Sequence, residues 1–235
     1  MTTTNFLKKS IHIIVWIFIL ILLPTCNSSH EPSKPQLVYP QNKQLIGEKA
    51  MVVSAHPLAS KVGTDILKQG GSAVDAAIAV QFALAVTYPA AGNIGGGGFM
   101  VIRLANGQTK TLDFREKAPL AATADMYLDK DKNVIDRLSL DGHLAVGVPG
   151  TVDGMIKAYD EFSHLNDFKK LVQPAIDLAN NGFKLTEREA KNLNGNKEKF
   201  TKLNTATPVF VKENGDWTKG ELLVQKDLGL SLIHI

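Results

Sequence analysis

The segment from Ala73 to Val86 has almost no polar face, because small apolar side chains surround it when it is placed on a helix. Ser72 and Asp75 stand at the spacing of a capping box, which predicts that the helix begins at Ala73. The run is shorter than the about 20 residues that a bilayer span needs. A helix without a polar face must be covered on all sides, so we expect it at the centre of a globular core.

The composition agrees with a protein that is held together by such a core. Of 235 residues, 44% are hydrophobic and 21% are charged, which argues against disordered, collagenous and coiled-coil chains. The single cysteine, Cys26, excludes an internal disulfide and a zinc site built on paired cysteines. The six histidines show no ligand spacing, so we expect neither a metal site nor a cofactor.

Residues 1–25 differ from the rest and indicate a signal peptide. Lys8 and Lys9 precede an uncharged run from Ile11 to Leu23, which fits the roughly 7–15 residues of a signal-peptide core. Cys26 follows closely and resembles the lipid-bearing cysteine of a bacterial lipoprotein. Thr25 departs from that pattern, so a plain secretory signal and an uncleaved anchor stay open as alternatives. We expect an extracytoplasmic protein, either periplasmic or anchored to the membrane through a lipid on Cys26.

Residues 26–45 are polar and proline-containing, which is typical of a semi-extended tether, and residues 46–235 form the globular domain. Cleavage before Cys26 would remove Lys8 and Lys9 from the 26 basic residues and leave 24 against 23 acidic ones. The net charge of +3 therefore gives little reason to expect a nucleic-acid partner.

Local start and stop signals predict further helices. The expected helices run from Pro57 to Gly70, from Thr151 as N-cap to Phe162, from Gln173 with Pro174 in its first turn to Asn180, and from Asp227 to Ile235. Asn181-Gly182 is expected to close the helix that ends at Asn180, and a capping box of Thr186 with Glu189 indicates that another helix begins there.

Strands are expected in four segments. They are a short buried strand over 50–54, two strands over 99–104 and 108–114 that form a hairpin across Ala105-Asn106-Gly107, and a strand over 208–212 before a turn at Asn214-Gly215.

The most glycine-dense segment runs from Gly92 to Gly98. A phosphate-binding loop normally opens a helix, but a strand is predicted to follow here, and no Gly-Lys-Ser/Thr ending is present. Nucleotide binding is therefore not expected. By itself the segment indicates a turn in which the backbone packs closely.

Asp113 and Arg115 lie on one face of the second hairpin strand, which allows a simple ion pair between them. The alternative is that Arg115 presents its planar guanidinium to a ligand carboxylate, a two-pronged contact that lysine cannot reproduce. Local chemistry alone favours the ion pair. Elsewhere the chain holds no Gly-x-Ser-x-Gly or His-Glu-x-x-His motif, and Asp160-Glu161 is expected to be exposed.

The order of several motifs carries more information than any one of them. Taken together they resemble the first half of a γ-glutamyltranspeptidase (glutathione hydrolase). The motifs are Met51-Val52-Val53-Ser54, Gly70-Gly71-Ser72-Ala73-Val74-Asp75-Ala76-Ala77, Gly92-Asn93-Ile94-Gly95-Gly96-Gly97-Gly98-Phe99-Met100, Asp113-Phe114-Arg115-Glu116-Lys117-Ala118-Pro119, Gly147-Val148-Pro149-Gly150-Thr151, Gln173-Pro174-Ala175-Ile176, Asn181-Gly182-Phe183 and Leu223-Val224-Gln225.

The resemblance implies an α/β (α+β) fold of the N-terminal nucleophile hydrolase type, an αββα sandwich of which this chain is part of the large subunit. It implies a precursor that cuts itself and uses the new N-terminal Thr of a small subunit to cleave γ-glutamyl amides such as glutathione. Arg115 would then bind the α-carboxylate of the γ-glutamyl group.

No Thr of this chain stands in the context at which such precursors cleave, so we expect the catalytic residues to lie outside it. The domain is expected to be truncated at its C-terminus, to need the small subunit as its partner, and to be inactive alone. Two alternatives stay open. One is a related acylase that acts on a glutaryl or cephalosporin-type amide, and the other is a non-catalytic lipoprotein remnant.

Overall fold

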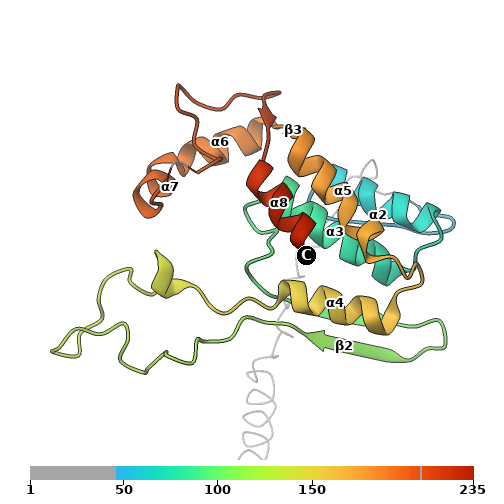
Figure 1. Cartoon of the computed structure of the whole chain (residues 1–235), viewed down its shortest axis with the longest axis horizontal. Helices are drawn as coiled ribbons and strands as arrows, with labels where there is room; N and C mark the ends of the chain where they lie inside the picture. The colour runs from blue at the N-terminus through green and yellow to red at the C-terminus, as the bar shows by residue number, and fades with distance from the viewer. Residues whose placement is uncertain (1–45, 207) are drawn as a thin grey trace, which may run out of the picture. The chain divides into compact units, whose positions relative to one another are not determined.

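The computed structural model describes residues 46–206 and 208–235, and Gly47–Ile235 form one compact unit (Figure 1). The apolar helix α3 (Ala73–Thr87) lies at its centre, as predicted. It packs against α2 (Pro57–Lys68), α4 (Thr151–Phe162) and α5 (Phe168–Asn181), and α8 (Lys226–His234) packs on α5. Buried side chains from most of the circumference of α3, such as Ala76, Ile78 and Phe82, join the same core, whereas Ala73 and Ala77 on the remaining side are exposed.

Asp75 joins the start of α3 to the residues after α4. Its carboxylate accepts hydrogen bonds from the backbone N–H groups of Ser72 (2.7 Å) and His164 (3.0 Å), and from the hydroxyl of Ser163. Burial raises the pKa of this carboxyl, but the hydrogen bonds, led by that from Ser163, outweigh burial and lower the pKa below its ordinary value. The predicted capping box is confirmed, and it also holds two helices together.

The hairpin is confirmed as β1 (Phe99–Arg103) paired antiparallel with β2 (Thr109–Asp113). Gly107 takes the positive φ of 85° that the turn requires. A second antiparallel pair joins β3 (Phe183–Lys184) to β4 (Leu222–Leu223). In the described residues these two-stranded sheets are separate, so those residues by themselves do not form the implied stack of two sheets.

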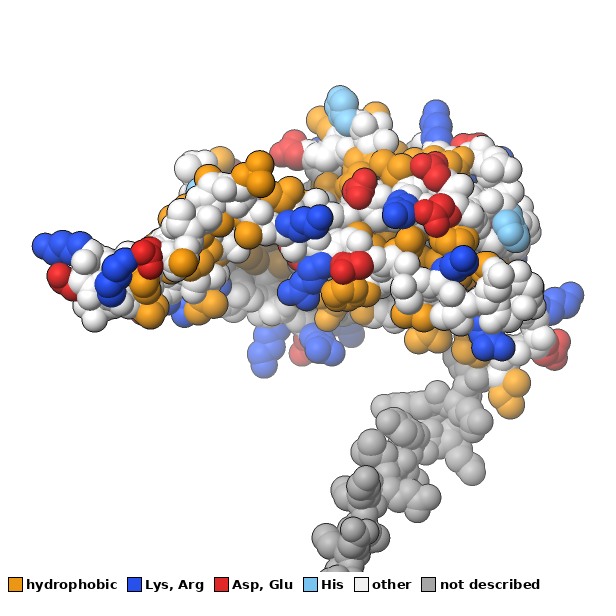
Figure 2. Space-filling model, turned by 90° about the horizontal axis from the view of Figure 1, so that it is seen from below, with side chains coloured by type: hydrophobic (Ala, Val, Ile, Leu, Met, Phe, Trp, Pro, Cys, Tyr) orange, Lys and Arg blue, Asp and Glu red, His pale blue; other side chains and the backbone are white. Residues whose placement is uncertain are grey.

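The hairpin leaves large apolar side chains uncovered, as expected for strands without a covering layer. Phe99 is 64% exposed and Val101 74% exposed. Figure 2 shows the side of the molecule that faces downward in Figure 1, where hydrophobic side chains reach the surface among charges of both signs.

The remaining helices are α6 (Glu187–Gly195), α7 (Lys197–Leu203) and the 3-10 turn η2 (His143–Ala145). The predicted helix from Gln173 was placed too late. It begins at Phe168, because Asp167 caps it by accepting a hydrogen bond from the backbone N–H of Lys170, and Pro174 lies inside the helix. The predicted end is confirmed, since Gly182 closes the helix with a φ of 77°.

Two predicted strands are wrong. Residues 50–54 have no ladder partner in the described part of the chain, and Met51 and Val53 are exposed rather than buried. Residues 208–212 form a turn, in which the N–H of Val211 bonds to the carbonyl of Pro208. Apolar, β-branched composition favours strands, but a strand needs a neighbouring edge to pair with.

The signal peptide over 1–25, the lipidation of Cys26 and the whole tether over 26–45 lie outside the described residues. Of the helices that the structure describes, none has the length and apolar character to cross a membrane.

Candidate functional site

Three segments that are far apart in the sequence meet at the end of β2. They are the glycine-rich loop (Gly92–Gly98), the residues Asp113–Lys117 and the loop Gly147–Thr151. Gly98 and Phe114 exchange both backbone hydrogen bonds (3.3 and 3.1 Å), and Lys117 and Val148 do the same (3.2 and 2.8 Å). The carbonyl of Gly96 accepts from the N–H of Gly150 at 2.8 Å. The three motifs thus form one unit, which we call the Arg115 corner.

Glycines allow this close approach around Phe114. A Cβ atom on Gly150 would lie 2.2 Å from the carbonyl oxygen of Phe114, and one on Gly97 would lie 2.6 Å from the same oxygen. A Cβ on Gly154, in α4, would lie 2.2 Å from Cγ of the Phe114 ring. Glycines of the glycine-rich loop and of the start of α4 therefore allow the chain to pack closely around Phe114, the residue directly before Arg115.

Thr151 was predicted to cap α4, and this is wrong. The N-cap is Gly150, which has no side chain to cap with, and Thr151 is the first helical residue and fully buried. Its hydroxyl instead donates to Oδ1 of Asn93 at 2.8 Å. Helix starts are local signals, but the buried hydroxyl of Thr151 needs a hydrogen-bond partner, and the side-chain oxygen of Asn93 lies within reach.

The backbone of Arg115 is fixed by a hydrogen bond, whereas its side chain is largely exposed to solvent. Its N–H donates to Oδ1 of Asp113 at 3.0 Å, and its side chain is 67% exposed. Within the described residues, the only ion pair of Arg115 is a contact of Nε with Oε2 of Glu116 at 3.5 Å. The ion pair between the Arg115 and Asp113 side chains, which local chemistry favoured, is therefore wrong: Asp113 instead accepts from the backbone.

The Arg115 corner can bind an anion but shows no acid–base machinery of its own. Among the described residues nothing pairs with the terminal nitrogens of Arg115, which form a planar pair of donors that suits a carboxylate. In the described ranges no group of three or more His, Cys, Asp or Glu side chains could hold a metal ion. Asp160-Glu161 is exposed, as predicted.

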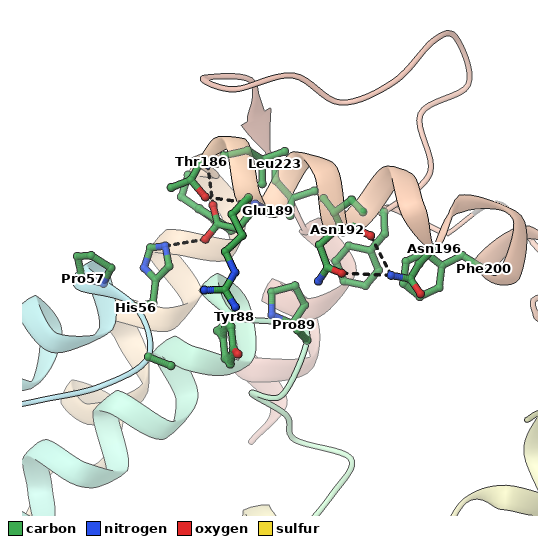
Figure 3. A pocket seen from close by; sticks show the side chains of 17 residues that line it. His56, Pro57, Tyr88, Pro89, Thr186, Glu189, Asn192, Asn196, Phe200 and Leu223 are labelled. Carbon is green, nitrogen blue, oxygen red and sulfur yellow. Dashed lines mark hydrogen bonds and ion pairs between the residues drawn. The ribbon is translucent and has the colours of Figure 1, made fainter. Parts of the chain in front are cut away.

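A cavity of about 570 Å³ lies elsewhere, between the starts of α2 and α6 (Figure 3). Sequence reasoning did not predict it. His56, at the start of α2, and Glu189, in the first turn of α6, point toward one another, with Nε2 and Oε1 3.1 Å apart. His56 Nδ1 accepts from the N–H of Leu58 at 3.2 Å and so caps α2, while Glu189 Oε2 accepts from the N–H of Thr186 at 2.7 Å and completes the predicted capping box of α6.

The cavity is therefore a junction between two helix caps. Both nitrogens of His56 and both carboxylate oxygens of Glu189 are already engaged, and the ring of His56 packs edge-on against Phe183. The capping residues could be found in the sequence, but no local signal showed that the two caps meet. Because His56 and Glu189 are engaged by each other and by the two helix starts, we place the candidate site at the Arg115 corner rather than in the cavity.

A family model described as Gamma-glutamyltranspeptidase matches residues 59–235. The glutathione hydrolase proenzyme of Pseudomonas sp. (strain A14) is 53% identical over 186 residues, which cover 79% of this chain and 32% of the relative. The acylase ACY 1 proenzyme of Pseudomonas sp. (strain V22) is 36% identical over 82% of this chain and 35% of the relative. The chain thus spans about a third of the length of these curated relatives.

The crystal structure of Helicobacter pylori γ-glutamyltranspeptidase is similar in fold. It superposes with a TM-score of 0.78 at 49% identity and covers 82% of this chain and 55% of that one.

Proposed function

Because this chain belongs to the γ-glutamyltranspeptidase family, we propose that it is the part of a γ-glutamyltransferase or glutathione hydrolase that binds the substrate through Arg115. One observation carries the proposal. The guanidinium of Arg115 is exposed on a backbone that three segments hold in place, and its one ion pair within the described residues leaves the terminal nitrogens unused. Such a group matches the α-carboxylate of a γ-glutamyl compound.

The planar guanidinium matters more than its charge. Two parallel N–H groups bind both oxygens of a carboxylate and so set its orientation as well as its distance. That orientation would place the γ-amide, at the other end of the glutamyl group, at a defined point for attack. Glu116, in contact with Nε, would keep the guanidinium from rotating away.

The chemistry would be acyl transfer to an N-terminal Thr that lies outside this chain, on a small subunit cut from the same precursor. The Thr hydroxyl attacks the γ-glutamyl carbonyl carbon while the α-amino group takes its proton. The C–N bond then breaks, and cysteinylglycine leaves with the proton on its amine. Attack by water on the ester releases glutamate, and attack by an amino acid or dipeptide amine completes transfer. The chain alone would be inactive.

The test is Arg115→Lys in the complete enzyme, assayed with a γ-glutamyl anilide. Loss of the two-pronged contact should raise KM by roughly 10- to 100-fold, since a hydrogen bond to a charged group contributes about 1.5–3 kcal/mol. Arg103→Lys, at the other end of the hairpin, is the matched control and should leave KM unchanged. An unchanged KM for Arg115→Lys would overturn the role of Arg115.

The alternative is a related acylase, for which Arg115 would bind the carboxylate of a glutaryl or cephalosporin-type amide. It is supported by the acylase relative at 36% identity, against 53% for the glutathione hydrolase. Comparing turnover of a γ-glutamyl anilide with that of a glutaryl anilide separates the two. Turnover of neither by the complete protein would favour a non-catalytic lipoprotein.

We also propose that the protein is extracytoplasmic and anchored through a lipid on Cys26. The support is the sequence itself: two lysines, an uncharged apolar run and then the single cysteine. Labelling of the bacterial protein with a radioactive fatty acid should be lost in Cys26→Ser. Equal labelling of both proteins, or of neither, would contradict the proposal.

A further inference from the structure

Asn93, in the glycine-rich loop, makes three hydrogen bonds with its side-chain amide. Oδ1 accepts from the N–H of Gly96 at 2.9 Å and from the hydroxyl of Thr151 at 2.8 Å, and Nδ2 donates to the carbonyl of Ala91 at 3.1 Å. One oxygen atom therefore joins the glycine-rich loop to the first residue of α4, across 58 positions of sequence.

The two segments that Asn93 joins, the glycine-rich loop and the start of α4, pack on either side of Phe114 and form the walls around it. Gly98 pairs with Phe114 from the side of the loop, and Gly150 touches the Phe114 carbonyl from the start of α4. The carbonyl of Gly96 accepts from the N–H groups of both Gly150 and Thr151, at 2.8 and 3.1 Å. Movement of α4 away from the loop would open the space in which the backbone directly before Arg115 is held.

We propose that Asn93 and Thr151 are positioning residues that set the place of Arg115 for a substrate carboxylate, a role that rests on the proposed function. Neither residue has a hydrogen bond to Arg115 within the described part of the chain; they act through the walls around Phe114. We call the pair the Asn93–Thr151 clamp. Because a two-pronged contact depends on the direction of the guanidinium, a loosened clamp should weaken binding of the carboxylate.

The test changes one atom group at a time in the complete enzyme. Thr151→Val keeps the buried volume but removes the hydroxyl, and should raise KM for a γ-glutamyl anilide roughly tenfold with little change in kcat. Thr151→Ser keeps the hydroxyl but removes a buried methyl group. It should lose stability yet keep a KM near that of the wild type, an outcome that a merely structural role would not produce.

Thr87→Val is the matched control. Thr87 is also fully buried, and its hydroxyl donates to the carbonyl of Ala83 at 2.9 Å, within α3 rather than to a residue of the Arg115 corner. It should lower stability as Thr151→Val does and leave KM unchanged. Asn93→Ala, at a half-buried position, should raise KM by itself, and the double variant with Thr151→Val should add little, because both remove the same link.

The outcomes separate this proposal from the proposed function. If the wild-type enzyme turns over the anilide and neither Thr151→Val nor Asn93→Ala raises KM, the clamp is wrong while the function stands. If the wild type turns over no γ-glutamyl compound, the function fails. The clamp can then be tested on the full chain by measuring hydrogen exchange of backbone N–H groups. The N–H groups of Gly98 and Phe114 should exchange faster in Thr151→Val and not in Thr87→Val, and equal protection would overturn it.

Discussion

Polar side chains are paired in the cavity between α2 and α6 but exposed at the Arg115 corner. In the cavity, the side chains of His56 and Glu189 contact each other, and each also accepts a hydrogen bond from a backbone N–H at the start of a helix. At the Arg115 corner, the backbone is satisfied by close packing, and the charged end of the side chain is left in solvent.

The difference teaches that volume is a poor guide to function in this molecule. His56 and Glu189 in the cavity are already paired and offer a ligand few unused hydrogen bonds. At the Arg115 corner, a fixed backbone carries a guanidinium whose terminal nitrogens have no ion pair within the described residues. Changes in the cavity should therefore alter stability without altering binding, and changes at the Arg115 side chain should do the reverse. Arg115→Lys tests the second expectation, and three further experiments test the packing of the Arg115 corner, the cavity and the contact between the two regions.

Gly150→Ala should have the largest effect. The new Cβ would lie 2.2 Å from the Phe114 carbonyl oxygen, a backbone atom that cannot rotate aside. We expect a loss of about 3 kcal/mol in the free energy of unfolding, at the upper end for an overpacked site, measured by urea denaturation. Gly95→Ala is the control, because nothing lies within 4 Å of a Cβ there. Equal stability of the two variants would show that the Arg115 corner is not tightly packed.

His56→Ala should have a smaller effect, confined to stability. It removes the cap of α2 and the partner of Glu189, so we expect a loss of about 2 kcal/mol. KM for a γ-glutamyl anilide should stay unchanged in the complete enzyme. His143→Ala, at an exposed histidine, should change neither quantity. A raised KM in His56→Ala would place the cavity in the functional site and reverse the contrast.

The smallest expected effect is a local change in stability where the two regions are joined. There Nζ of Lys199, in α7, lies 2.8 Å from Oδ1 of Asp141, in the loop that follows Arg115. Hydrogen bonds from Arg137 and then Lys199 lower the pKa of Asp141 from 3.8 to about 2. Because the folded-state pKa is the lower one, the link stabilises the fold above pH 3.8 and is lost as the pH falls through about 2.

Hydrogen exchange can detect that loss. The N–H groups of Leu140 and Asp141 both bond to the carbonyl of Arg137 at 2.9 Å, and their protection factors should fall between pH 4 and pH 2. Asp141→Asn should show the low protection already at neutral pH, and Asp160→Asn, at an exposed position on α4, should not. Protection that is independent of pH in the wild type would mean that Asp141 does not hold the loop.

Helix boundaries were the most predictable part of the fold, because their signals are local. The capping boxes at Ser72 and Thr186 and the glycine at position 182 were each recognised from neighbouring residues and are confirmed. The start of α5 was missed, since Pro174 suggested a first turn while Asp167 supplied an earlier cap. The strands over 50–54 and 208–212 were wrong, because strand formation depends on partners that composition does not reveal.

The candidate site also has parts that the sequence predicts and parts that it does not. The sequence singles out Arg115, first as one member of an ion pair and then through the family resemblance. That Asp113 binds the backbone instead, and that Thr151 binds Asn93 rather than capping α4, could not be foreseen. Each depends on which acceptor lies within reach after the three segments meet.

The sequence by itself determined the buried central helix, most helix ends and the glycines that allow close packing, because these follow from propensities within a few residues. Only the tertiary structure decided how each polar side chain is used. Asn93, His56 and Arg115 all carry donors or acceptors, yet one joins two loops, one joins two helix caps and one remains open to solvent. Hydrogen bonds form over about 3 Å, so their partners are chosen by the packing of distant segments.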